Sequence, residues 1–143
     1  TTNLSTADIL DKQQNNHNIY FVGGKLSNGK VGGSCTEFLL RNVFFDQAFL
    51  SCRGISNEGY VSELLEEEAM LKKIIRQQTR ELLLVADEKK FGKSFTFTSL
   101  ASGFKRPVSL SAKYKLTIVS LTAHPIFPLV EHIRFEFHYS SFV

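Results

Sequence analysis

The chain of 143 residues is long enough to form one domain with a substantial hydrophobic core. Its hydrophobic content of 43% and charged content of 22% are those of an ordinary globular protein, and a net charge of +3 is too small to indicate nucleic-acid binding by itself. No apolar run approaches the ~18 residues of a membrane span, so we expect no contact with a membrane. Cys35 and Cys52 lack disulfide or metal-ligand spacing, which favours a reduced, cytoplasmic protein without a metal or another cofactor.

Helical and strand-like segments alternate over the first 90 residues. The spacing of apolar residues predicts three helices, over residues 5–14, 34–42 and 62–80. The pattern Ser5 to Asp8 matches a capping box, and Glu68 and Lys72 have the i,i+4 spacing of an ion pair on the third helix. Runs of β-branched, aromatic and aliphatic residues predict strands over residues 19–22, 44–52 and 82–86. This alternation implies a parallel sheet with helices on its faces, which is an α/β fold.

The texture changes beyond Lys93. Alternating patterns predict strands over residues 94–100, 114–121 and 133–139, with a loop at 124–128. Lys and Arg balance Asp and Glu over residues 1–100, so residues 101–143 carry the whole excess of positive charge. We therefore treat 1–143 as a single domain in which residues 101–143 differ in character from the rest.

Three predicted strands end in polar or glycine-rich loops, which begin at Gly23-Gly24, at Arg53-Gly54 and at Asp87. The carboxyl ends of parallel strands share one edge of the sheet, and Glu68 near the start of the third helix can reach that edge. Glycine amides and Lys90 suit a phosphate or carbonyl group, and Glu68 and Asp87 suit hydroxyl groups. The edge therefore favours a small polyhydroxylated anion as ligand.

Each of these features also has a purely structural interpretation. Gly23-Gly24 is compatible with a tight turn, the Glu68–Lys72 pair with a solvated helix surface, and Asp87 to Lys90 with a charged turn. There is no phosphate-binding P-loop or dinucleotide fingerprint, and the four histidines share no metal-ligand spacing. Only the convergence of the three loops supports a binding site.

Several motifs of the chain resemble those of one known family. Thr2-Asn3, Gly23-Gly24, the run FDQAFLSCRGISNEGY, then EEAMLKK and LLLVADEKKFGK occur in the order and at the spacing found in the effector-binding domain of DeoR-family transcriptional repressors. The resemblance covers residues 2–100. It implies a partial Rossmann-like open sheet with flanking helices, like that of the ribose-5-phosphate isomerase and glucosamine-6-phosphate deaminase superfamily.

The resemblance also implies a ligand and its binding residues. The family senses phosphorylated sugars, and the matching positions of this chain are Asn3, Gly23, Gly24, Gly54, Glu68, Asp87 and Lys90. We expect a phosphorylated sugar effector and a homo-oligomer. The DNA-binding helix-turn-helix and a phosphate-binding loop of the family would precede residue 1, so the chain itself is not expected to bind DNA. After Leu100 the resemblance fades, so it implies that 1–143 is a single, incomplete effector-binding domain with 101–143 as a divergent C-terminal part.

Two other functions stay open. An isomerase-like enzyme would use Glu68 or Asp87 to move a proton and Lys90 to stabilise an enediolate, although Cys52-Arg53-Gly54 occupies the place of a second catalytic aspartate. A fragment without ligand function would instead associate with itself through its sheet edges.

Overall fold

The computed structural model describes residues 1–13, 18–100, 108–111 and 116–122, the last two ranges by their backbone only. The helices are α1 (Leu4–Lys12), α2 (Ser34–Arg41), α3 (Glu66–Gln77) and the short 3-10 helix η1 (Glu88–Lys90). The first five strands are β1 (Lys25–Ser27), β2 (Lys30–Gly32), β3 (Phe45–Leu50), β4 (Gly54–Ile55) and β5 (Val61–Glu63). The remaining strands are β6 (Thr79–Asp87), β7 (Phe97–Leu100), β8 (Val108–Ser111) and β9 (Leu116–Thr122).

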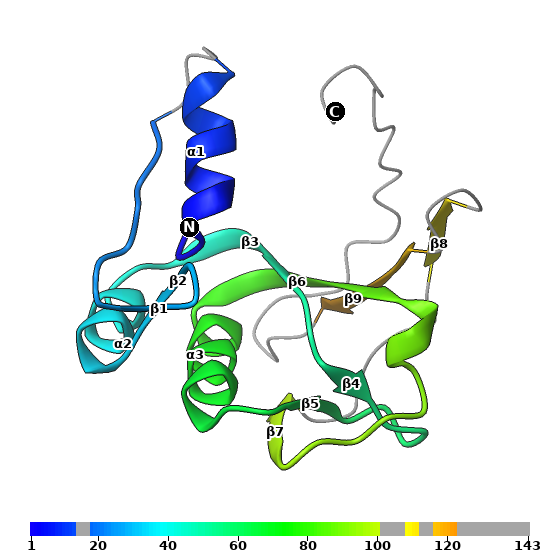
Figure 1. The fold of residues 1–143 in the computed structure, drawn as a ribbon. Helices are drawn as coiled ribbons and strands as arrows, with labels where there is room; N and C mark the ends of the chain where they lie inside the picture. Colours follow the sequence, from blue (N-terminus) through cyan, green and yellow to red (C-terminus); the bar gives the residue numbers. More distant parts are fainter. Residues whose placement is uncertain (14–17, 101–107, 112–115, 123–143) are drawn as a thin grey trace.

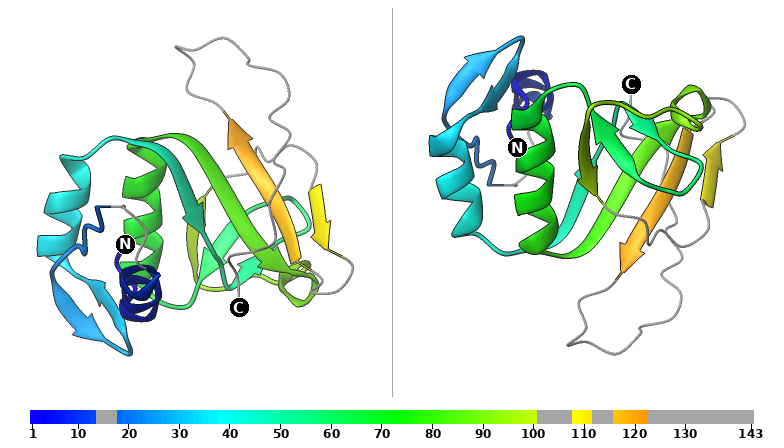
Figure 2. Two further views of the ribbon diagram at one scale, coloured as in Figure 1. Left: turned by 90° about the horizontal axis from the view of Figure 1, so that it is seen from above. Right: turned by 90° about the horizontal axis from the view of Figure 1, so that it is seen from below.

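Strand β6 is the centre of the main sheet, whose strand order is β3-β6-β9-β8. It pairs in parallel with β3 and antiparallel with β9, and β8 pairs antiparallel with β9. A second sheet, β4-β5-β7, is antiparallel, and β1 and β2 form a separate hairpin. Figure 1 shows α3 beneath β6, with the second sheet beyond it, and Figure 2 shows α2 and α3 side by side.

The hydrophobic core lies between the two sheets and α3. Leu82, Leu84 and Ala86 of β6 pack with Val61 of β5 and Leu100 of β7, and all five are buried. Because β6 has neighbours on both edges and buried residues at consecutive positions, its run of apolar residues is that of a fully buried strand. The apolar run ends at Asp87, the last residue of the strand, which is only partly buried.

The α/β class is confirmed, and so are the three helices within a few residues and the predicted strands that correspond to β3, β6, β7 and β9. The predicted parallel pairing of strands 44–52 and 82–86 is confirmed by β3 and β6, whereas the other strand pairings in the described ranges are antiparallel. The predicted strand at 19–22 is wrong, since these residues are mostly exposed and pair with no strand. The strand predicted at 133–139 and the loop at 124–128 lie outside the described residues.

Two local signals were misplaced. The first helix begins at Leu4 with Asn3 as its N-cap, because Asn3 Oδ1 accepts a hydrogen bond from the Thr6 amide at 2.9 Å; the cap predicted at Ser5 is wrong. The third helix begins at Glu66 and not at Ser62. Ser62 and Glu63 belong to β5, where both are buried against the neighbouring strands.

Candidate functional site

A cavity of about 210 Å³ opens beside the carboxyl ends of β3 and β6. Its walls come from the hairpin, the segment after β3, strand β5, α3 and η1, through Lys30, Ser51, Cys52, Arg53, Glu63, Glu68, Lys72 and Lys90. Since β3 and β6 run in parallel, the loops that follow them meet at this edge, as the strand pattern predicted. Nearly every lining residue is polar or charged, so the cavity suits a polar ligand.

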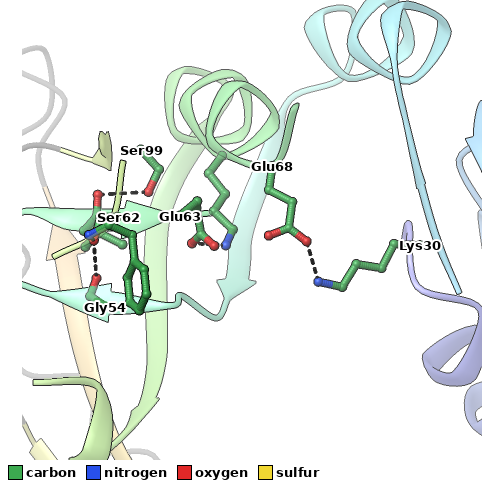
Figure 3. A network of polar contacts seen from close by, with 9 residues as sticks. Lys30, Gly54, Ser62, Glu63, Glu68 and Ser99 are labelled. Atoms are coloured by element: carbon green, nitrogen blue, oxygen red, sulfur yellow. Dashed lines mark hydrogen bonds and ion pairs between the residues drawn. The ribbon is translucent and has the colours of Figure 1, made fainter. Parts of the chain in front are cut away.

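Four cationic and two acidic side chains surround this cavity, and two of the cations are already paired. Lys72 on α3 forms a hydrogen-bonded ion pair with Glu63 of β5, and the Lys30 ammonium on the hairpin lies 2.7 Å from a Glu68 carboxylate oxygen. The Glu63 side chain is only 1% exposed and that of Lys72 14%, whereas Glu68 is 19% and Lys30 52% exposed. Figure 3 shows Glu63 and Glu68 next to each other, with Lys30 reaching across to Glu68. The two pairs thus join the hairpin, α3 and β5 around one polar space.

The two carboxylates differ in their protonation chemistry. Burial raises the pKa of Glu63 above its ordinary value, and the nearby Glu68 charge acts in the same direction, although Lys72 opposes both. Burial alone would also raise the pKa of Glu68, but the hydrogen bond and charge of Lys30, with the charge of Lys72, hold this pKa below its ordinary value. Glu68 is therefore the more strongly ionised acceptor of the two, and it is also the more exposed.

Arg53 and Lys90 complete the cavity wall without a carboxylate partner. Within the part of the chain that the structure describes, neither side chain takes part in an ion pair. The cavity therefore has an excess of two positive charges, carried by the residues that follow β3 and β6. Cations without a carboxylate partner can form charge-assisted hydrogen bonds to an anionic group in the cavity.

Cys52 forms the apolar part of the cavity wall and belongs to the core. Burial raises the pKa of its thiol to about 11, although the Lys90 charge opposes this effect. The thiolate is therefore scarce at neutral pH, and the structural role predicted for Cys52 is the appropriate one. Both cysteines are free, with Cys35 exposed.

Among the seven residues predicted to bind ligand, Glu68 and Lys90 line the cavity. Asp87 lies at the end of β6, three residues before Lys90, and its carboxylate accepts a hydrogen bond from the Lys89 amide at 2.9 Å. Asn3 caps α1 and forms a backbone bridge with Lys30, which does line the cavity. Ligand contacts of Asp87 and Asn3 stay predictions.

Two of the three predicted glycines, Gly24 and Gly54, occupy positions where the chain packs closely, whereas a Cβ atom on Gly23 would meet no atom within 4 Å. The Gly23 carbonyl accepts a hydrogen bond from the Thr36 hydroxyl at 2.9 Å, and a Cβ atom on Gly24 would lie 2.0 Å from that hydroxyl. A Cβ atom on Gly54 would lie 2.5 Å from the Lys93 carbonyl oxygen. None of the three lines the cavity, and their part in ligand binding stays a prediction.

Lys30, Arg53, Glu63 and Lys72 line the cavity and were not among the predicted site residues. Glu63 and Lys72 were assigned to one long helix, so the pairing predicted for Lys72 was with Glu68, whereas the ion pair that forms is with Glu63. Arg53 directly follows the predicted strand over 44–52, and its position at a strand end was the signal available for it. Lys30 was missed although Asn28-Gly29 is a strong sequence signal for a two-residue hairpin turn, and these residues have the φ values of such a turn, 50° and 74°.

Comparison with known proteins assigns the chain to a family. The family model described as "DeoR C terminal sensor domain" matches residues 1–103. The chain belongs to the family of DeoR C-terminal sensor domains. This confirms the resemblance drawn from the motifs over residues 2–100.

Individual relatives are transcriptional regulators. The "HTH-type transcriptional repressor GlcR" of Bacillus subtilis (strain 168) is 31% identical over 94 residues, which are 64% of this chain and 36% of that protein. An uncharacterised HTH-type transcriptional regulator, YgbI of Escherichia coli (strain K12), is 30% identical over 102 residues, or 70% of this chain and 39% of that protein. The glycerol-3-phosphate regulon repressor of Escherichia coli (strain K12) is 29% identical over 96 residues, or 66% of this chain and 38% of that protein.

The aligned region of this sensor domain thus spans well under half the length of the curated relatives it matches. No solved structure gives a significant match. Among the described residues, no helix is both long and apolar enough to cross a membrane. The same residues contain no group of three or more His, Cys, Asp or Glu side chains that could hold a metal ion.

Proposed function

We propose that this sensor domain binds a phosphorylated sugar or polyol in the cavity at the ends of β3 and β6. The observation that carries the proposal is the position of Arg53 and Lys90, two cations that line the cavity and form no ion pair within the described part of the chain. Guanidinium and ammonium groups are the usual side-chain partners of a phosphate group. Glu63 and Glu68 on the same cavity supply oxygen acceptors for hydroxyl groups.

The regulatory part of the proposal rests on the relatives. Two of them are named HTH-type regulators, and a third is named for the glycerol-3-phosphate regulon. We propose that the effector shifts a conformational equilibrium of a homo-oligomeric, cytoplasmic repressor whose helix-turn-helix lies outside this chain. We also propose that the domain shares the fold of the ribose-5-phosphate isomerase superfamily. In this proposal the domain binds the phosphorylated compound and does not convert it.

A binding experiment on the purified chain tests the proposal. Glycerol 3-phosphate and glucose 6-phosphate would be titrated by calorimetry, with glycerol, glucose and inorganic phosphate as comparison ligands. A ligand present at 100 times its Kd stabilises the folded state by about 2.7 kcal/mol, so thermal unfolding gives a second readout. We expect a phosphorylated compound to bind more tightly than its unphosphorylated form and to be recovered chemically unchanged.

Matched variants then locate the site. Lys90→Met removes a cation that lines the cavity, and Lys89→Met removes an exposed cation from the same short helix without touching the cavity. We expect Lys90→Met to weaken binding by about tenfold or more, because charge-assisted hydrogen bonds contribute about 1.5–3 kcal/mol each. The proposal would be contradicted if the two variants weakened binding equally, or if the phosphorylated and unphosphorylated compounds bound equally well. Conversion of the ligand would favour the isomerase-like alternative.

A further inference from the structure

The cavity lining contains two kinds of charged side chain. Among the described residues, Arg53 and Lys90 after β3 and β6 form no ion pair, whereas Glu63 and Glu68 pair with the other two cations, Lys72 and Lys30. A ligand whose phosphate contacts Arg53 and Lys90 presents the rest of its surface to the remaining lining, which includes the two carboxylate–lysine pairs. The chemistry of these two pairs, called the paired side below, therefore limits what the rest of the ligand can be.

The paired side can accept hydrogen-bond donors but has no free cation for a second anion. Glu63 is almost fully buried, so its lysine cannot turn to a ligand without leaving a buried carboxylate unpaired. Glu68 is the more exposed carboxylate and faces the cavity with its charge held by Lys30. A hydroxyl group can donate to Glu68, whereas a carboxylate at the same place would meet a like charge within a few ångströms.

We infer that this site selects phosphomonoesters with a neutral, hydroxyl-bearing end and rejects phosphorylated carboxylic acids of the same size, and that Glu68 is the residue that makes this distinction. This inference rests on the proposed binding of phosphorylated compounds and adds the class of compound to it. The cavity of about 210 Å³ has room for a phosphate with a short polyol.

The test compares pairs of ligands that share the phosphate and differ at the opposite end. Glycerol 3-phosphate is compared with 3-phosphoglycerate, and glucose 6-phosphate with 6-phosphogluconate, by calorimetry on the purified chain at one ionic strength. We expect the neutral member of a pair that binds to do so about tenfold or more tightly than the acidic member, because like charges in a partly buried site repel by at least this factor. Equal affinities, or tighter binding of the acid, would overturn the inference while leaving phosphate binding intact.

Two variants on the same turn of α3 test whether Glu68 causes the preference for the neutral ligand. Glu68→Gln removes the negative charge at the cavity and keeps an oxygen acceptor. The control is Glu67→Gln, because the Glu67 side chain is 59% exposed, lies 3.9 Å from Lys25 and does not line the cavity. We expect Glu68→Gln to bind the acid more tightly than the wild type does, so that the preference falls to about threefold or less. Glu67→Gln should keep the wild-type ratio.

The outcomes separate the inference from the proposal beneath it. If no phosphorylated compound binds, the proposed function fails and the inference falls with it. If phosphorylated compounds bind and Glu68→Gln keeps the wild-type preference, Glu68 is not the selecting residue and the inference is wrong. The ratio of the two affinities is the readout, so a general loss of affinity through a changed fold, which weakens both ligands alike, does not imitate the expected result.

Discussion

The buried ion pair between Lys72 and Glu63 makes a specific prediction about stability. Lys72→Met removes the partner of a carboxylate that is only 1% exposed and leaves its methylene stem in place. Breaking such a pair costs about 3–5 kcal/mol, and because Lys72 is 14% exposed we expect the lower limit, about 3 kcal/mol. For a chain of 143 residues this corresponds to a decrease in Tm of about 10 °C.

The loss should depend on pH with a definite sign. Burial raises the pKa of Glu63 above 4.5, so the folded protein binds more protons than the unfolded one and this contribution to stability falls as the pH rises above 4.5. The Lys72 charge opposes this rise, so Lys72→Met should raise the pKa of Glu63 further, and the fall of stability with rising pH should then continue to higher pH. The stability lost in Lys72→Met should therefore be larger at pH 8 than at pH 5, where Glu63 is closer to being protonated.

Thermal and urea unfolding followed by circular dichroism would measure both effects. Lys73→Met, the exposed neighbour on α3, is the control and should change stability by less than about 0.5 kcal/mol. The double variant Glu63→Gln with Lys72→Met should lose less than the sum of the single variants, by about 1–3 kcal/mol, because it leaves no charge without its partner. The reasoning is refuted if Lys72→Met resembles Lys73→Met, or if the two single losses simply add.

Three further predictions concern other parts of the chain. Burial raises the pKa of Glu68, but the hydrogen bond and charge of Lys30 outweigh burial and lower it, so the ionised Glu68 stabilises the folded state above pH 4.5 and this stabilisation is lost as the pH falls below 4.5. Glu68→Gln should therefore lower the free energy of unfolding by about 0.5–1 kcal/mol at pH 7, and urea unfolding should show a smaller difference from the wild type toward pH 3. Gly24→Ala should destabilise by about 2 kcal/mol or more, because its Cβ atom would overlap a hydroxyl of α2, whereas Gly23→Ala, with no atom within 4 Å, should unfold like the wild type. A thiol reagent at pH 8 should modify Cys35 quickly and Cys52 only in denaturant, because Cys52 is buried and has a pKa of about 11; two fast thiols would contradict the burial.

How well the fold could be predicted depended on how local each signal was. The strand β6 was predictable because five consecutive apolar residues bounded by charge are a strong local pattern. The segment Ile19–Val22 has the same kind of pattern and forms no strand, because a strand also needs a partner edge, which no local pattern specifies. The antiparallel placement of β9 beside β6 is a long-range pairing and was equally invisible in the sequence.

The site residues, too, were predictable only where the local sequence pattern was strong. Lys90 could be placed on the sheet edge because it follows a recognisable buried strand. Glu63 could not, since its three-residue strand is too short to show a period and directly precedes a strong helical pattern. Its burial depends in part on a partner more than thirty residues away, since Glu63 pairs with Phe97 in the second sheet.

Lys30 shows why the hairpin matters to the site as well as to the fold. Its backbone bridges to Asn3 at the start of α1, and its ammonium group binds Glu68 at the cavity. The Leu4 amide binds the Gly29 carbonyl and the Val31 amide binds the Thr2 carbonyl, so the hairpin is fixed to the residues that begin α1. Apart from the Lys30–Glu68 pair, the hairpin is held by these backbone bonds and by the 3.9 Å pair of Lys25 with Glu67. The first structural consequence of an occupied cavity should therefore appear in the hairpin and the N-terminus of α1, at a distance from the buried core that keeps β6 in place.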